Sequence, residues 1–326
     1  MKSWLKPIVL AVGATLVVTT ILLAFVWPTK TLTIHNIPIS LVGPEAATGP
    51  FETALEANEP GVINFIDSAS REQAVSQIKT RETYGAVILA APGSSPEVLT
   101  APAANNLVAQ MLNGVAQAIQ AQVSAQVAAA GGDTTQVHVA VTPIVPLSTD
   151  DPTGSGLTAA AFPLMIGGII GGVMPSFLLI RRRHRALFIG VFAVVAASVL
   201  VGVLQGWFGF LQGNFWANLG AVALGIAATA ALVAGLNNVL GRPGLALGAA
   251  FTFLVANPLS SAAMPWQFIA EPWGEFGQDL VPGASNWLIR SLSYFPDADV
   301  TRQWLTLGVW FLAGVVLLAL PKLKRR

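Results

Sequence analysis

The residues best spaced for acid–base chemistry are three carboxylates, Glu271, Glu275 and Asp279, which recur at intervals of four. On a helix this spacing places side chains on one face, where paired carboxylates could act as acid and base. Like charges at this spacing usually mark a solvated face, and Pro272 and Gly274 would interrupt the helix. We therefore expect no catalytic carboxylate pair, and we expect a protein that is not an enzyme.

The sequence lacks the residue patterns of a metal site, a nucleotide-binding loop and a serine nucleophile. The chain has no cysteine, and its histidines, His35, His138 and His184, lie far apart in the sequence, so no metal site is expected. A phosphate-binding loop requires Gly-Lys-Ser or Gly-Lys-Thr, and no lysine here follows a glycine. A Gly-x-Ser-x-Gly nucleophile motif is also missing. No cofactor and no nucleic-acid partner is predicted.

The composition indicates that much of the chain has lipid as its solvent. Of the 326 residues 54% are hydrophobic and 10% are charged, whereas soluble domains contain ~25% charged residues. The apolar residues form blocks of about twenty, the length that crosses a bilayer. Six blocks predict six transmembrane helices, at residues 7–27, 157–180, 186–208, 217–240, 244–258 and 306–320. The first block is longer than a signal-peptide core, so we expect an uncleaved anchor.

The distribution of charge predicts the orientation of these helices. All 16 acidic residues lie within 45–151 or 271–299, whereas 11 of the 17 basic residues flank the apolar blocks. With a cytoplasmic N-terminus, six spans place every basic cluster in the cytoplasm, as the positive-inside rule requires. The Ala-, Gly- and Val-rich composition fits a bacterium, so we expect a multi-pass protein of the bacterial cytoplasmic membrane with both termini inside.

The chain then divides into three parts. Residues 1–29 form the cytoplasmic N-terminus and first span, residues 30–156 an extracytoplasmic mixed α/β domain, and residues 157–326 a five-helix transmembrane domain. In the α/β domain the patterns predict strands at 37–43, 62–66, 85–90, 98–100 and 136–145, and helices at 51–58, from Ser70 onward, and at 103–130. Ser70 and Gln73 match a helix-capping pattern.

A stretch between the last two spans, residues 257–301, mixes aromatic, acidic and proline residues; we call it the aromatic segment. Such mixing favours short interfacial or re-entrant helices, with a solvated loop as the alternative. Polar groups at membrane depth are costly unless they have partners. The candidate substrate or interface residues are Asn257, Trp266, Glu271, Trp273, Glu275 and Arg290 of this segment, with Gln205 from the third span.

Two pairs of glycines in the second span, Gly167 with Gly171 and Gly168 with Gly172, are spaced by four residues. This spacing allows helices to approach closely in lipid. Packing within the bundle is enough to explain them, and a homodimer interface is a second use.

The arrangement resembles the ABC-2-type permease-like membrane proteins, in particular the YhgE and phage-infection-protein relatives. The resemblance rests on one N-terminal span, the strand at 37–42, the strand at 85–90, the turn at 151–156, and the stretches 257–260, 280–284 and 290–295. It implies a six-helix half-permease that works as a dimer. Members of the family export lipids, polymers, peptides or drugs, often with a separate ATPase.

One departure from the family concerns the link between the second and third spans. It is only the basic run Arg181, Arg182, Arg183 and Arg185, which is short for a coupling helix that engages an ATPase. We expect these arginines to contact a cytoplasmic partner, an ATPase or another membrane transporter. Two functions follow: a permease or transport-associated protein that handles an amphiphilic, lipid-like envelope substrate, or a non-transporting scaffold or accessory subunit that binds a partner through the α/β domain.

Overall fold

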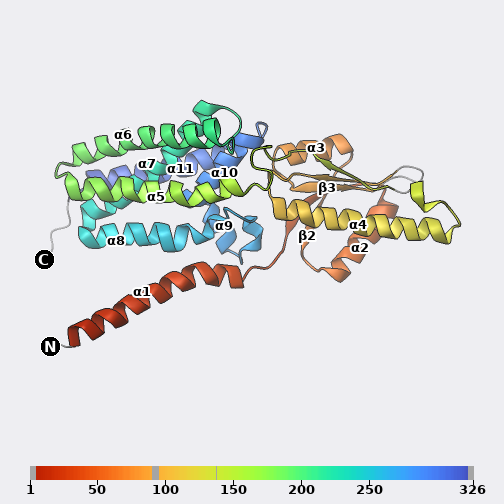
Figure 1. The fold of residues 1–326 in the computed structure, drawn as a ribbon, viewed down its shortest axis with the longest axis horizontal. Coiled ribbons are helices and arrows are strands. Elements are labelled where there is room, and N and C mark those ends of the chain that lie inside the picture. The colour runs from red at the N-terminus through yellow and green to blue at the C-terminus, as the bar shows by residue number, and fades with distance from the viewer. Residues whose placement is uncertain (1–4, 90–94, 137, 322–326) are drawn as a thin grey trace.

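The computed structural model describes residues 5–89, 95–136 and 138–321, which form two parts placed end to end along the longest axis (Figure 1). One part is a bundle of helices, and the other is a small α/β domain. The described ends of the chain both lie at the end of the bundle remote from the α/β domain. The predicted strand positions Ala90 and Val137 fall outside the described residues, as do the basic residues Lys2, Lys322, Lys324, Arg325 and Arg326.

In the described part of the chain, five helices are long and apolar enough to cross a membrane. They indicate a multi-pass protein embedded in a membrane. The five are α1 (Leu5–Lys30), α5 (Ser155–Leu178), α6 (Arg182–Val201) with its π-helical continuation η2 (Gly202–Trp207), α7 (Phe215–Leu240) and α11 (Thr301–Ala319).

The apolar block at 244–258 forms a shorter helix than the other five. Helix α8 (Arg242–Ala250) has nine residues and continues as the π-helix η3 (Phe251–Ala256), which has six. At ~1.5 Å per residue the two together reach only about 22 Å. The π-helix ends there because Pro258 has no amide hydrogen with which to continue the backbone hydrogen bonds. Five of the six predicted blocks therefore have the length of a span, and this one is short.

Helix α7 is the centre of the bundle. In its most apolar stretch 72% of the residues are buried, whereas α1 has none buried and lies at an angle to the others (Figure 1). Small side chains allow this burial, because α7 carries alanine or glycine at most of the positions from Gly225 to Gly235. In lipid, where apolar surface gains little by leaving the solvent, such close packing holds helices together.

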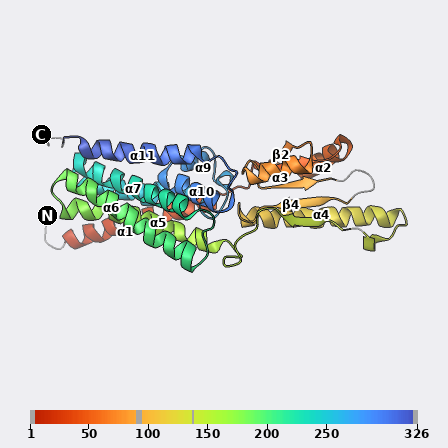
Figure 2. The same cartoon turned by 90° about the horizontal axis from the view of Figure 1, so that it is seen from above.

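The α/β domain contains a five-stranded mixed sheet in the order β2-β1-β3-β4-β5, in which only the β3–β4 pair is antiparallel. Its strands are β1 (Ile37–Val42), β2 (Ile63–Asp67), β3 (Gly85–Ile88), β4 (Glu97–Thr100) and β5 (Ala140–Pro143). Its helices are α2 (Glu45–Asn58), α3 (Arg71–Lys79) and α4 (Asn106–Ala129), and η1 (Thr134–Gln136) is a single 3₁₀ turn. Helices α3 and α4 cover opposite faces of the sheet (Figures 1 and 2).

Most predicted elements of this domain are present with shifted ends. Ser70 caps α3, where its hydroxyl accepts from the amide of Gln73 3.2 Å away. Helix α2 begins at Glu45 and continues through Pro50, so the prediction that it begins at residue 51 was wrong. The expected strand at 136–145 is limited to β5, because only those residues pair with β4. The aromatic segment forms short helices: η4 (Pro258–Ser260), η5 (Trp266–Phe268), α9 (Trp273–Gln278) and α10 (Val281–Tyr294).

The contact between α7 and α11 generates a first prediction. A Cβ atom added at Gly314 of α11 would meet backbone atoms of Ala231 and Leu232 on α7. Backbone atoms cannot swing aside as a side chain can, so we expect Gly314→Ala to lower the thermal midpoint of the purified protein, at a cost of about 1–3 kcal/mol.

A matched substitution on the same helix is the control. A Cβ at Gly308 would have no atom within 4 Å. Gly308→Ala should therefore leave the midpoint unchanged or raise it slightly, since alanine favours the helix. Equal midpoints for the two variants would contradict the packing described for α11.

Candidate functional site

An apolar groove runs along one face of the α/β domain between α2 and α4. The cavity is about 450 Å³ in volume, and β1 and β2 form its floor. Its lining residues come from the chain before β1, from both helices and from both strands: Ile34, Ile37, Ile39, Phe51, Ala54, Leu55, Asn58, Glu59, Ile63, Val108, Met111, Leu112, Gly114, Val115, Ala118, Ile119 and Gln122. We call this cavity the apolar groove.

The sequence makes α4 an amphipathic wall for this groove. Apolar residues recur at Val108, Met111, Leu112, Val115 and Ile119, the spacing that keeps them on one helix face. Helix α4 is also capped at its start, because the side chain of its N-cap asparagine accepts from two backbone amides of the first turn. The only polar residues that line the groove are two on α2 or just after it and one on α4, so its interior suits a hydrocarbon chain.

A more open depression lies on the other side of α2, beside the edge strand β2, with a volume of about 670 Å³. Four carboxylates line it, those of Glu52, Glu56, Glu59 and Asp67. Such a surface repels anions and offers little apolar area. The apolar groove is therefore the better candidate for an amphiphilic ligand, although its volume is smaller.

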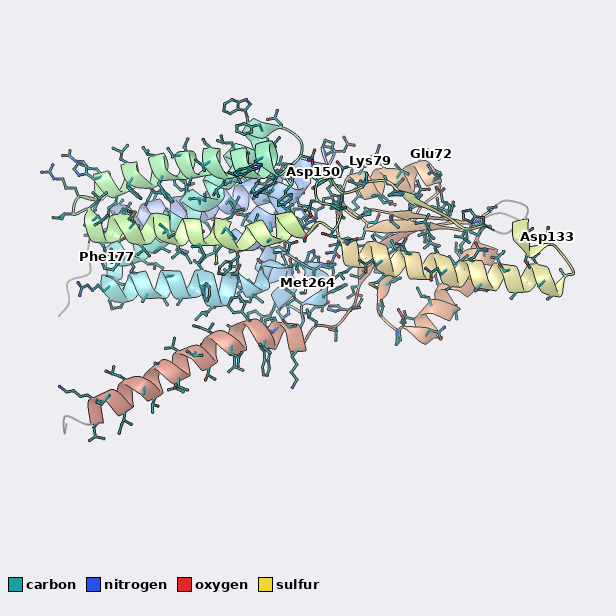
Figure 3. All side chains as sticks on the ribbon, viewed as in Figure 1. Glu72, Lys79, Asp133, Asp150, Phe177 and Met264 are labelled. Carbon is teal, nitrogen blue, oxygen red and sulfur yellow. The ribbon has the colours of Figure 1, made fainter. Side chains whose placement is uncertain are left out.

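The aromatic segment is packed against the end of the α/β domain that faces the bundle. Phe268 and Phe295 are 5% and 2% exposed and belong to the hydrophobic core of the α/β domain, not to that of the bundle. The amide of Thr33, in the link from α1, donates to the carbonyl oxygen of Phe268 at 3.2 Å. Figure 3 shows Met264 and Asp150 at this level of the molecule, with Phe177 far from it. The two parts thus share a common apolar junction.

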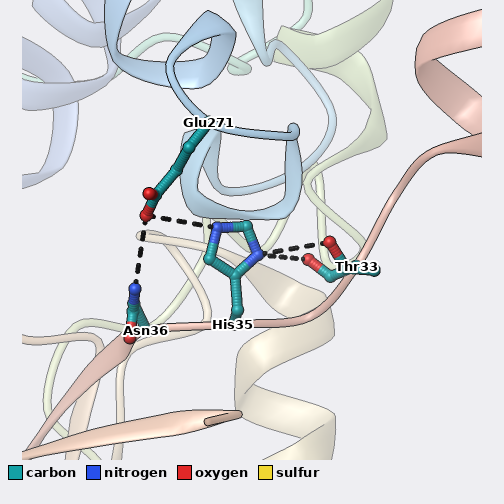
Figure 4. Close-up of polar contacts among 4 residues, drawn as sticks. All are labelled: Thr33, His35, Asn36 and Glu271. Carbon is teal, nitrogen blue, oxygen red and sulfur yellow. Dashed lines mark hydrogen bonds and ion pairs between the residues drawn. The ribbon is translucent and has the colours of Figure 1, made fainter.

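Glu271 joins the link that follows α1 to the aromatic segment (Figure 4). Its Oε1 atom lies 3.7 Å from Nε2 of His35 and accepts from Nδ2 of Asn36 at 3.4 Å. The His35 ring is held from the other side, where Nδ1 lies 2.8 Å from the carbonyl oxygen of Thr33. Asn36 has a φ of 53°, a left-handed conformation that asparagine tolerates well. The Glu271 side chain is 73% exposed, so these contacts connect the link to the aromatic segment but contribute little stability.

A second, small cavity of about 30 Å³ lies within the junction; we call it the junction cavity. Two arginines approach it, Arg81 from the turn after α3 and Arg290 from α10. The complete lining is Arg81, Tyr84, Ala104, Asn105, Ser260, Ser261, Ala262, Met264, Pro265, Trp266, Gln278, Asn286, Trp287 and Arg290. None of these residues is acidic, so the cavity has a positive potential.

The two guanidinium groups are held by neutral groups only. Nη1 of Arg81 donates to the carbonyl oxygen of Trp287 at 3.2 Å and to Oγ of Ser291 at 2.7 Å, and its Cζ lies 3.6 Å from the centre of the Trp287 ring. Nη1 of Arg290 donates to the carbonyl oxygen of Ala103 at 3.0 Å. Burial lowers the pKa of Arg81 to about 9, and the nearby positive charge of Arg290 acts in the same direction.

The candidate residues predicted from the sequence lie at different places in the structure. Trp266 and Arg290 line the junction cavity, and Glu271 contacts the link. Trp273 and Glu275 are exposed on α9.

The side chain of Gln205 stabilises a turn. Its Nε2 donates to the carbonyl oxygen of Gly213 at 2.9 Å, and its Oε1 accepts from Asn218 at 3.0 Å. The amide of Gln205 is thus used by the protein itself, which is the ordinary fate of polar groups at membrane depth. For Asn257 the structure gives a contact of the backbone, whose carbonyl oxygen accepts from the amide and the hydroxyl of Ser260.

The glycines of α5 face other helices of the same chain. A Cβ at Gly168 would lie 2.6 Å from Cβ of Thr229, and one at Gly172 would lie 2.7 Å from the carbonyl oxygen of Ala230, both on α7. Gly171 faces Phe192 of α6, and Gly167 has only a distant neighbour on α7. Three of the four glycines are therefore explained by packing within the bundle.

The basic run between α5 and α6 caps helix ends. Arg185 is buried and donates from Nε and Nη2 to the carbonyl oxygens of Leu179 and Ser176, where α5 ends. Arg182 donates to the carbonyl oxygen of Ala319 at the end of α11. Cations at helix C-termini are stabilising. Arg181 and Arg183 are exposed and remain available for a partner, whereas Arg185 is not.

No sequence pattern predicts several residues of the junction cavity. Arg81, Tyr84 and Asn105 belong to the α/β domain, and they meet Gln278 and Trp287 only through tertiary contact. Tyr84, whose pKa is raised by burial, donates from its hydroxyl to Oε1 of Gln267 3.2 Å away. One sequence pattern relates to the apolar groove, the amphipathic pattern of α4. That pattern predicts that one face of α4 is buried, and it does not predict that a groove stays open beside this face.

Comparisons with protein-family models, with curated proteins and with solved structures give no match for this chain.

The shared apolar junction generates a second prediction. Phe268→Ala should detach the aromatic segment from the α/β domain, because truncation of a buried phenylalanine costs about 3–5 kcal/mol. We expect faster hydrogen–deuterium exchange of the amides in the link and in β1. Phe276→Ala is the control, since Phe276 lies in the same segment and is 43% exposed. Equal exchange in both variants would disprove the role of Phe268.

Proposed function

We propose that this chain is a transport-associated membrane protein with ABC-2-permease-like topology that handles an amphiphilic, lipid-like molecule of the bacterial envelope. The observation that carries the proposal is the apolar groove of the α/β domain. Its volume of about 450 Å³ falls within the ~300–1,000 Å³ that is typical of small-molecule sites. Its apolar lining suits an acyl chain, because burial of each methylene group contributes ~0.8 kcal/mol.

The position of the groove supports this proposal. Ile34, which lines one end, follows α1 by four residues and stands next to Thr33, which bonds to the aromatic segment. An acyl chain that leaves the outer leaflet would meet the groove at this end. The exposed aromatic rings of Trp273 and Phe276 at the same level suit the interface between lipid and water.

Six spans, with the α/β domain outside the cytoplasm, form part of the proposal. Helix α8 starts directly after α7 ends, and η3 leads into the aromatic segment beside the α/β domain. The ring centroids of Phe25 and Phe253 are 5.3 Å apart, so η3 packs beside the domain-side half of α1. This short helix would thus make the fifth crossing. The described basic residues Lys6, Arg181 and Arg242 then share one side, the cytoplasmic one.

A second candidate function is that of a non-transporting scaffold or accessory subunit in an envelope export complex. It is favoured by the link between α5 and α6, which consists of residues 179–181 alone. No coupling helix fits in three residues, and two of the nearby arginines are used to cap helices. In this case a separate transporter or ATPase would contact Arg181 and Arg183, and a homodimer would form through faces outside α5.

The groove proposal is tested with tryptophan substitutions that fill the groove. Ala118→Trp on α4 and Ala54→Trp on α2 replace exposed lining residues, so the core is not disturbed. We expect photolabelling by a phosphatidylglycerol with a diazirine in its acyl chain to weaken roughly thirtyfold, because loss of two or three methylene contacts costs about 2 kcal/mol.

Ala125→Trp is the matched control, because Ala125 is exposed on α4 and lies outside the groove lining. Labelling of this variant should equal that of the unmodified protein, and mass spectrometry should place the label on residues of α2 and α4. If labelling of Ala118→Trp and Ala54→Trp equals that of Ala125→Trp and of the unmodified protein, the groove is ruled out as the lipid site.

A deletion experiment in cells distinguishes the transport role from the accessory role. If the chain transports, its deletion should change the amount of a lipid or amphiphile in the outer envelope, and a point variant that blocks the groove should reproduce the change. If deletion leaves envelope lipids unchanged and the purified protein neither recruits nor stimulates an ATPase, the transport proposal fails and the accessory role stands.

A further inference from the structure

The junction cavity contains two positive charges without a negative partner. In the described part of the chain the ion pairs are His35–Glu271, Arg71–Glu97 and Arg302–Asp279, and none of them includes Arg81 or Arg290. Unpaired buried charge is costly, typically several kcal/mol for each ion. A protein that keeps two such groups side by side either uses neutral acceptors for them or binds an anion.

Neutral acceptors account for only part of their hydrogen-bonding capacity. A guanidinium carries five N–H donors, and among the described residues Arg290 donates from Nη1 to the carbonyl oxygen of Ala103. The Nε atom of Arg81 is buried and has no hydrogen-bond partner among the described residues. The described neutral acceptors therefore use only part of the donors of Arg290, and one donor of Arg81 has neither solvent nor a partner.

One carboxylate that acts on Arg290 is already in use. Burial lowers the pKa of Arg290, and the charge of Asp151 opposes this with a smaller effect. Oδ2 of Asp151, however, accepts from the amides of Gly156 and Leu157 at 2.9 and 3.4 Å and so caps the first turn of α5. Asp151 does not line the junction cavity and leaves it with a positive charge.

The rest of the lining is neutral. Asn286 adds an amide group to it. The amides of Asn105 and Gln278 and the hydroxyls of Ser260 and Ser261 already donate to oxygen atoms of the protein. The aromatic rings of Trp287 and Phe295, 3.6 and 5.0 Å from Cζ of Arg81, orient its planar guanidinium. The two arginines are therefore the groups that would bind phosphate oxygens, through charge-assisted hydrogen bonds.

We propose that the junction cavity binds a phosphate group between Arg81 and Arg290. Its space of about 30 Å³ is two to three times the ~10–15 Å³ that one water molecule requires, so a phosphate group would enter with part of its surface outside the cavity, and a whole lipid would not fit. The phosphate belongs either to a lipid head group that enters from the membrane surface or to a free ion. The proposal does not depend on the apolar groove, and each can fail without the other.

The test uses the full chain, purified in a maltoside detergent without phosphate. One arm adds inorganic phosphate and compares it with chloride at equal ionic strength. The other arm adds dihexanoyl phosphatidic acid and compares it with dihexanoylglycerol, which has the same tails and no phosphate. The thermal midpoint and the stoichiometry in native mass spectrometry are measured in both arms.

We expect at least one of the two phosphate-bearing probes to raise the thermal midpoint in a saturable manner. Native mass spectrometry should show one bound molecule of that probe per chain. Arg290→Gln should raise the half-saturation concentration about tenfold or more, as expected for loss of a charge-assisted contact. Arg302→Gln, which removes an exposed arginine of the same region, should not change it. A response to inorganic phosphate identifies a free ion as sufficient, and a response to phosphatidic acid alone identifies a lipid head group.

Two results would overturn the proposal. One is that neither phosphate probe stabilises the protein more than its phosphate-free counterpart. The other is that Arg290→Gln binds as tightly as the unmodified chain. If Arg290→Gln does not fold, Arg290→Lys keeps the charge but loses the paired geometry, and it should still bind phosphate several-fold more weakly. Binding of Arg290→Lys equal to that of the unmodified chain would contradict the proposed contact.

Discussion

The burial of Phe268 and Phe295 in the core of the α/β domain is the interaction on which the arrangement of the molecule depends. The α/β domain has no disulfide, since the chain has no cysteine, and the chain enters and leaves it through two short links. Apolar burial by the aromatic segment therefore fixes the domain on the bundle. The same contact places α10 beneath the turn after α3, where Arg81 stacks on Trp287.

The two parts of the chain are stabilised by different physics. In the α/β domain, side chains leave water when they pack, and β1 supplies the fully buried residues Ile37, Ile39 and Leu41. In the bundle, apolar side chains lose little by facing lipid, so close packing and satisfied polar groups matter more. Thr252 illustrates this, because its buried hydroxyl donates to the carbonyl oxygen of Gly248 at 2.9 Å. Nδ2 of Asn238 likewise donates to the carbonyl oxygens of Leu317 and Leu320 at the end of α11, although its Oδ1 is buried without a partner among the described residues.

An apolar cavity and a cationic cavity lie on either side of the start of α4. Asn105, the N-cap of this helix, lines the junction cavity, and Val108, three residues later, lines the apolar groove. A molecule with an acyl chain and a phosphate has the two chemistries that these neighbouring surfaces would recognise. The aromatic segment contributes to the cationic cavity only, and α2 contributes to the apolar groove only.

The sequence by itself determined the apolar helices, the order of strands and helices in the α/β domain, and the importance of the aromatic segment. These features follow from composition and from periodicity over a few residues, as in the caps and the amphipathic face of α4. Only the tertiary structure showed that α2 and α4 stand apart enough to leave a groove, and that Arg81 meets Arg290. The reason is that those two arginines are about two hundred residues apart, and their contact depends on how two parts of the chain pack and not on any local pattern.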